Sequence, residues 1–499
     1  MRPHVKRLRL CLLLFPGLLS FAPTPCPAEQ APVIRSIAVR GNARTREGVI
    51  RRELLFAVGE RLDSGRVAET ARNLRGLPFL GGADIRVRVE GGAADVQVEV
   101  EDLYARAVTP LLSGRPGELS YGVAALDYNF LGRGQTAEVT LAHDAVTGNR
   151  GEVAYGNPRL FGSRHALDAG LQVGSEGHDA RLTVSMPFHR LSARWAYAVS
   201  FQDLEQQQRR YASQALVEMY TEQTLSAGLY LSRSCGDAVK VRPELRLTLS
   251  DRRFTPEPGY PSGPADRRRV LPSLGVTVWR PRYETARFLF DLGRTEDAQT
   301  GSWLSVRHGV SLRGLGSDRN FGFLQAQVVP TWRPWDRGYV FALGLLRTSY
   351  GRRGYFNLFA IAGLSVYARV GESHSLAVRG QWEAVSRSEE GAQLLLGLEG
   401  GLRGYPIRRF DGTRRALFNI EARPTYFRHR VFVLAGAFFL DGGAAWAPGR
   451  TAPAWSAAAG MGLRLGLSRV YNSPILRADL GYGLRDRAWQ LGLGLGQYF

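Results

Sequence analysis

The sequence contains little cysteine and almost no lysine. Two of its three cysteines, Cys11 and Cys26, lie close to the N-terminus, so Cys235 stands alone once that segment is removed. A single thiol cannot form an internal disulfide, which excludes a disulfide-stabilised scaffold. Lysine occurs only at Lys6 and Lys240, and the formal net charge of +20 at pH 7 is therefore an excess of arginine.

Long apolar runs are also missing after the first thirty residues. No stretch there offers the about 18 uninterrupted apolar residues that a transmembrane helix needs. At the N-terminus, residues 1–9 are cationic, residues 10–22 are apolar, and a proline-rich segment ends at the small residue Ala28. This order predicts a secretory signal peptide over residues 1–28, and we expect the mature protein to be exported.

Motifs of common enzymes are absent. The sequence has no HExxH, GxSxG, GxxxxGK[ST] or CxxC, and its eight histidines show no close metal-ligand spacing. The arginines are spread along the chain and do not form one basic stripe with stacking aromatics. We therefore expect no enzymatic activity, no catalytic residue, no metal, no cofactor and no nucleic-acid partner.

The first part of the mature chain changes its pattern several times. After a short extended segment come two stretches with helical spacing, for which Thr45 and Asp63 are candidate N-caps. Residues 84–89 and 96–101 then alternate between apolar and polar side chains, as two half-buried antiparallel strands do. The pattern predicts a small β-α-α-β-β domain within residues 29–104.

Beyond about Glu118 the alternation has period two and continues to the C-terminus. One face is aliphatic with aromatics near segment ends, and the other mixes glycine with charged residues. In a soluble sandwich, which is the alternative, small residues seldom fill a whole face. The observed mixture favours a wet barrel lumen behind a lipid-facing band with aromatic girdles. The last segment shows the pattern most clearly, with Trp489, Leu491, Leu493, Leu495 and Phe499 on one face.

Residues 105–499 are therefore predicted to form an all-β transmembrane barrel of antiparallel strands. Spans of about ten residues would allow about 16 strands with generous loops, and the alternating segments number roughly fifteen to nineteen. An even number follows if both ends of the chain lie on the same side of the membrane.

Three segments resemble one known family. Residues 33–102, residues 122–141 (GVAALDYNFLGRGQTAEVTL) and residues 397–423 (GLEGGLRGYPIRRFDGTRRALFNIEAR) are similar to the BamA/TamA-type outer-membrane assembly and translocation factors. Members of this family have periplasmic POTRA domains followed by a sixteen-strand barrel. The resemblance implies a short member with a single POTRA domain.

The family's motifs can be located residue by residue. Leu402-Arg403-Gly404-Tyr405 is similar to its VRGF/VRGY loop motif, FFLDGG with Asp441 is similar to its F-x-D-x-G strand motif, and Phe499 resembles the C-terminal signal of outer-membrane proteins. In the family the loop folds back into the barrel and the motif arginine meets the motif aspartate.

The resemblance therefore implies an inserted loop around residues 397–415 and a pair between Arg403 and Asp441, with Glu421 and Asp479 as secondary partners. An arginine-rich loop cannot face hydrocarbon, and a guanidinium can bind a carboxylate through two parallel hydrogen bonds. The alternative is a solvated external loop whose charges pair with nothing.

The implied function is insertion or translocation of unfolded outer-membrane or secreted polypeptides, in the outer membrane and with the POTRA domain in the periplasm. Clients would add a strand to the free sheet edge of the small domain, or to a seam between residues 118–127 and 488–499. Outer-membrane lipid or lipopolysaccharide and accessory envelope proteins are further expected partners. The alternative is a structural pore or anchor. Glycines at 492, 494 and 496 either weaken the seam or make room for the loop.

Overall fold

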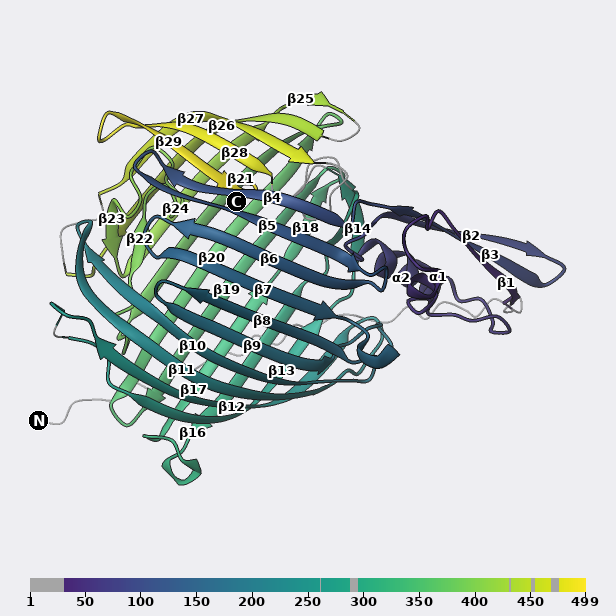
Figure 1. The fold of residues 1–499 in the computed structure, drawn as a ribbon, viewed down its shortest axis with the longest axis horizontal. Coiled ribbons are helices and arrows are strands. Elements are labelled where there is room, and N and C mark those ends of the chain that lie inside the picture. Colours follow the sequence, from purple (N-terminus) through teal and green to yellow (C-terminus); the bar gives the residue numbers. More distant parts are fainter. Residues whose placement is uncertain (1–30, 261, 288–294, 430–431, 450–453, 468–474) are drawn as a thin grey trace, which may run out of the picture.

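The computed structural model describes residues 31–260, 262–287, 295–429, 432–449, 454–467 and 475–499. The predicted signal peptide, residues 1–28, lies outside the described residues. The described chain forms a small α+β domain beside one end of a large barrel (Figure 1).

The small domain has the predicted element order. A three-stranded sheet holds β3 (Ala93–Asp102) between β1 (Val33–Arg40) and β2 (Leu80–Glu90). Strand β3 runs parallel to β1 and antiparallel to β2. Because β3 lies in the middle, β2 forms one edge of the sheet. Helices α1 (Glu47–Arg51) and α2 (Ser64–Arg75) supply apolar side chains to a core against the inner face of the sheet.

One of the two predicted helix caps is confirmed. The Asp63 carboxylate accepts hydrogen bonds from the backbone N–H groups of Gly65 and Arg66, which would otherwise lack partners at the start of α2. The Thr45 prediction is wrong, because Arg46 is the N-cap of α1 and makes no side-chain cap. The Thr45 hydroxyl instead donates to Asp102 at 2.6 Å and accepts from the Asn129 side chain at 3.1 Å, so long-range partners occupy it.

The barrel is closed and contains 20 strands within the described residues, so the prediction of an all-β barrel is confirmed and the number of about 16 is wrong. In strand order, β18 continues β17 along β19, and β25 continues β24 along β26. The strands are β4 (Arg106–Arg115), β5 (Glu118–Phe130), β6 (Gln135–Asp144), β7 (Gly148–Asn157), β8 (Ala166–Gly174), β9 (Gly177–Met186), β10 (Trp195–Ala212), β11 (Ala215–Arg233), β12 (Lys240–Pro256), β13 (Arg267–Trp279), β16 (Trp303–Ser311), β17 (Phe321–Val329), β18 (Thr331–Trp335), β19 (Gly338–Gly351), β20 (Gly354–Val370), β21 (His374–Ser386), β24 (Arg414–Arg423), β25 (Thr425–Arg428), β26 (Phe432–Trp446), β27 (Ser456–Leu467), β28 (Leu476–Gly483) and β29 (Ala488–Leu495).

The strand number was underestimated because generous loops were assumed. Several hairpins turn within a few residues instead, as at residues 145–147 and 175–176, and the saved length forms further strands. The sequence pattern also did not predict strand β4. Pro110 interrupts its apolar run, and proline within a run argues against a paired strand.

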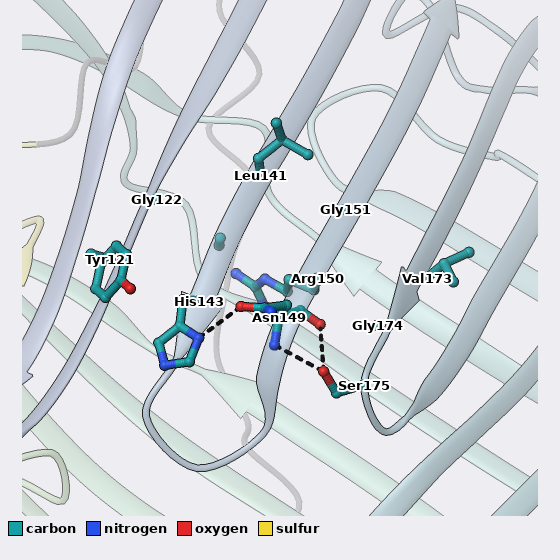
Figure 2. A pocket seen from close by; sticks show the side chains of 11 residues that line it. Tyr121, Gly122, Leu141, His143, Asn149, Arg150, Gly151, Val173, Gly174 and Ser175 are labelled. Atoms are coloured by element: carbon teal, nitrogen blue, oxygen red, sulfur yellow. Dashed lines mark hydrogen bonds between the residues drawn. The ribbon is translucent and has the colours of Figure 1, made fainter.

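The outward face of the barrel carries the predicted apolar band. Leu141, Leu245 and Leu274 are exposed there to 60%, 53% and 67%. Figure 2 shows the ends of β5 to β8 near the turns at residues 145–147 and 175–176, where a surface depression of about 600 Å³ includes Tyr121 and His143. Their rings lie 5.2 Å apart, as in an aromatic belt at a membrane boundary. No described helix is both long and apolar enough to cross a membrane.

The small domain is bound to one end of the barrel by partly buried polar contacts. Between β13 and β16 a hairpin of β14 (Tyr283–Arg287) and β15 (Thr295–Gln299) extends toward the domain. Arg75 of α2 binds both carboxylate oxygens of Asp297 at 2.8 Å. Glu53 of the domain pairs with Arg159 after β7. These contacts fix the domain beside the barrel mouth.

Candidate functional site

The chain between β21 and β24 folds into the barrel lumen. Its strands β22 (Leu394–Leu396) and β23 (Phe410–Gly412) pair as a short hairpin, and the residues between them form the inserted loop. Leu402, Arg403 and Tyr405 have no exposed surface. The two apolar members pack against a small cluster from β22, β24 and β27, namely Leu396, Leu417 and Ala458.

Arg403 lies at the centre of the buried polar contacts. Its Nε and Nη2 donate to the two carboxylate oxygens of Asp441 at 2.8 and 2.9 Å, and its backbone N–H donates to the same carboxylate at 3.2 Å. A guanidinium bound in this fork is fixed in both distance and direction. The rings of Phe439 and Tyr498 lie 3.5 and 4.2 Å from its carbon Cζ, so the planar cation is also stacked.

The two secondary partners lie on either side of this pair. Arg403 Nη1 binds Glu421, and its distance to the Asp479 carboxylate is 4.0 Å. The structure thus brings together Arg403, Asp441, Glu421 and Asp479, which the sequence places on a loop and three different strands. Removing water from four ionised groups is costly unless each keeps a partner of opposite charge.

Two arginines that the sequence analysis did not single out complete the charge balance of this site. Arg464 of β27 forms an ion pair with Asp479 at 2.7 Å, and Arg423 of β24 donates a hydrogen bond to Glu421 at 2.8 Å. Three guanidiniums therefore face three carboxylates, a set we name the loop cluster: Arg403, Arg423, Arg464, Glu421, Asp441 and Asp479. The sequence did carry a signal for these two arginines, because both lie on the polar face of alternating segments, as the predicted carboxylates do.

An amide extends the loop cluster toward β21. Asn419 donates to Asp441 at 2.7 Å and to the Gly401 carbonyl at 2.8 Å, and its own carbonyl accepts from Arg379 at 2.8 Å. The amide therefore ties the backbone of the inserted loop to the wall of the barrel. All three of its contacts are buried or partly buried.

The other loop arginines also have partners. Arg408 binds Glu118 at the start of β5, and Arg409 binds Asp486 in the turn after β28 at 2.8 Å. Arg414 and Arg415 both donate to backbone carbonyls within the partly buried loop base. The alternative of a solvated loop with unpaired charges does not describe this arrangement.

Tyr405 and Gly404 fit the loop tip against β27 and β28. The Tyr405 hydroxyl donates to the Ala457 carbonyl at 2.9 Å and accepts from the Arg485 backbone N–H at 3.1 Å. A Cβ atom on Gly404 would lie 2.6 Å from the Ala458 side chain and 2.7 Å from the Gly483 nitrogen. Only a glycine allows the backbone to approach the wall this closely.

The glycines of the last strands make room for the loop where they face it. A Cβ atom on Gly481 would lie 3.0 Å from backbone atoms of Arg403, and one on Gly492 would lie 2.6 Å from Leu398. For Gly492 the geometry therefore favours the second of the two interpretations left open above. Gly496 has a different role, because its φ of +79° turns the chain after β29.

This turn places the C-terminus in the lumen. Phe499 was predicted on the outward face with Leu491, but strand parity ends at Leu495, so that prediction is wrong. The Phe499 carbonyl accepts from Arg423 at 2.8 Å, and its ring lies 4.8 Å from the Arg379 guanidinium. The Tyr498 hydroxyl donates to the Leu398 carbonyl at 2.5 Å. The last residues thus pack on the inserted loop and its cluster.

The seam of the barrel lies between β4 and β29. Residues 118–127 were predicted as the first strand, but they belong to β5, which pairs with β4 on one side and β6 on the other. Between β29 and β4 the register contains one pair, Leu493 with Gly114, whereas β4 pairs with β5 along its whole length. The seam is therefore the weakest line of backbone pairing in the described barrel.

A closed barrel with an apolar outward face and a charged, loop-filled lumen defines a transmembrane β-barrel. No protein-family model and no curated protein matches the chain. Among solved structures, the chain is similar to BamA from Haemophilus ducreyi lacking POTRA domains 1–3, with 13% identity and a TM-score of 0.41 over 93% of this chain and 84% of that one. It is also similar to CdiB from Escherichia coli, with 12% identity and a TM-score of 0.48 over 93% of this chain and 76% of that one. CdiB from Acinetobacter baumannii gives 13% identity and a TM-score of 0.46 over 93% and 74%.

Proposed function

We propose that this protein is an outer-membrane factor that inserts or translocates unfolded polypeptides, with its small domain acting as a single periplasmic POTRA domain. The observation that carries the proposal is the seam. Closing a barrel removes every free strand edge, and here one line of closure is held by a single registered pair. Separation of β4 from β29 would expose two strand edges that can pair with an incoming chain.

The inserted loop and the C-terminus supply a rigid support next to this seam. The last residues after β29 are held by Arg423, and Leu398 of the loop packs at Gly492 of β29. Opening would therefore move β4 against a last strand that the loop cluster keeps in place. Arg408 binds Glu118 at the turn between β4 and β5, which gives the loop a contact on the other side of the seam as well.

The small domain offers a second edge near the barrel mouth. Beside β2 and β3 lies a cavity of about 640 Å³, bordered by Gly81–Asp84 of the edge strand, Thr285 of β14 and Arg369 of β20. A chain that adds to the β2 edge would pass through this cavity on its way to the barrel, and backbone pairing would require little of its sequence.

A disulfide across the seam tests the proposal. If the strands pair beyond Leu493 and Gly114, the antiparallel register aligns Leu112 with Leu495, and directly opposed residues have a spacing that a disulfide can bridge. In a Cys235→Ser background, oxidised Leu112→Cys/Leu495→Cys protein should lose client assembly in cells, and reduction should restore it. Leu112→Cys/Tyr121→Cys is the matched control, because it joins the registered neighbours β4 and β5. Full activity of the oxidised seam variant would contradict seam opening.

The alternative function is a structural pore or anchor. Depleting the protein and measuring the outer-membrane proteome separates the two: selective loss of other barrels or exported proteins supports the assembly function. An unchanged proteome with altered small-solute conductance supports the pore.

A further inference from the structure

The wall of the lumen formed by β12 to β19 carries three arginines, Arg246, Arg307 and Arg347, that have fewer carboxylate partners than their charge requires. Arg307 of β16 and Arg347 of β19 both lie opposite Gln325 of β17 in the strand register, one on each side. Adjacent strands are about 4.8 Å apart, so long side chains on these two strands reach the same space. Arg246 of β12 lies two residues from Glu244, whose register partner Gly275 lies opposite Arg307.

These three side chains, which we name the arginine wall, are poorly compensated. Arg307 donates to the neutral Gln325, and the nearest carboxylate to Arg246 is that of Glu244 at 3.7 Å. Within the described chain, Arg347 has no hydrogen bond or ion pair, and the Nε atoms of Arg246 and Arg307 are buried without a hydrogen-bond partner. Donors of this kind call for an acceptor from outside the chain.

Space for such an acceptor is present. A cavity of about 430 Å³ opens beside Arg347 and Gln325. Its two glutamates, Glu389 and Glu390, are already bound by arginines outside the arginine wall, including Arg267 and Arg319.

From this geometry we propose that the arginine wall binds a phosphate-bearing anion inside the lumen. Phosphate oxygens accept several guanidinium hydrogen bonds at once, and a multivalent anion gains most from several neighbouring cations. The proposal is independent of the assembly function, because its evidence comes from neither the seam nor the loop cluster. A soluble phosphorylated compound and a lipid headgroup share this chemistry.

Calorimetric titration of the full-length protein with inorganic pyrophosphate tests the site. Arg347→Gln is the main variant, because the loss of this side chain leaves no bound partner behind. Losing a charge-assisted contact should weaken pyrophosphate binding about tenfold. Arg246→Gln should act similarly, and Arg347→Lys should fall between it and the wild type, because lysine keeps the charge and loses the fork. Arg352→Gln, in the exposed turn after β19, is the matched control and should bind as the wild type does.

Two results would overturn the proposal: unchanged pyrophosphate binding by both Arg347→Gln and Arg246→Gln, or an equal loss in Arg352→Gln. Heat-modifiable gel mobility identifies folded variants, and Arg347→Lys serves if the glutamine variant does not fold. Repeating the titration in phosphatidylglycerol and phosphatidylcholine nanodiscs separates the sources. Equal pyrophosphate affinity in both nanodiscs supports a soluble compound. Weaker pyrophosphate binding in phosphatidylglycerol alone, through competition by the lipid, supports a lipid headgroup.

Discussion

The two charged walls of the lumen differ in how their arginines are compensated. In the loop cluster, three guanidiniums face three carboxylates, and Arg403 has no exposed surface. In the arginine wall, Arg347 has no partner among the described residues and Arg246 remains 38% exposed. Balanced charge allows burial and fixes geometry, whereas unbalanced charge requires water or a ligand. The first wall therefore holds the structure together, and the second remains available for binding.

The largest loss of stability is expected in the loop cluster, where the charges balance. Asp441→Ala should lower the free energy of unfolding by about 3–5 kcal/mol, because it leaves the buried Arg403 cation without its main partner. Urea titration in lipid vesicles measures the change, and protease access to residues 400–415 should rise with it. Arg403→Ala should behave alike. Wild-type stability and protease resistance in both variants would remove the structural role of the pair.

A smaller loss is expected from filling the space that the loop occupies. Gly481→Ala places a methyl group 3.0 Å from backbone atoms of Arg403, and overpacking of this kind costs about 1–3 kcal/mol. Gly442→Ala is the matched control, because nothing lies within 4 Å of the added atom. Heat-modifiable gel mobility compares the two variants. Equal mobility shifts would mean that the loop does not press on β28.

Removing the Tyr405 hydroxyl should cost less again. Tyr405→Phe loses one bond to the Ala457 carbonyl and one from the Arg485 N–H, worth about 1 kcal/mol each. The same urea titration reports the loss, with protease access near the loop tip as a local measure. A variant as stable as the wild type would show that water replaces both contacts.

The smallest effect is expected at the arginine wall. Arg347→Gln should change the free energy of unfolding by no more than about 0.5 kcal/mol, because no buried partner is left behind. This result, set against Asp441→Ala in the same titration, measures the difference between the two walls directly. A loss as large as that of Asp441→Ala would mean that Arg347 is compensated after all.

Much of the barrel could be predicted from alternation, and the errors came where alternation stops. Pro110 interrupts the alternation in β4, and short turns merge several strands into apparent single segments. The predicted strand number and the predicted first strand of the seam were therefore both wrong. Phe499 was placed by extending the parity of β29 through Gly496, whose positive φ ends that parity. A glycine that turns the chain and a glycine that makes room for a loop look alike in a sequence.

The site was predictable in part. The resemblance of residues 402–405 to a family motif directed attention to Arg403 and Asp441, which the structure brings together. Arg423 and Arg464 were not singled out, because a lumen-facing arginine becomes a partner only when the register sets a carboxylate beside it. Nothing in the segment around Arg347 distinguishes it from the many other arginines of the chain.

The sequence by itself determined the period of the strands, the apolar outward face and the excess of arginine in a chain with almost no lysine. These follow from local side-chain chemistry and from the alternation of a strand. The tertiary structure decided the number of strands, the single pair at the seam, the inward turn of the C-terminus and which arginines meet carboxylates. Those features depend on the register between distant segments, and one residue of shift would move every side chain to the opposite face.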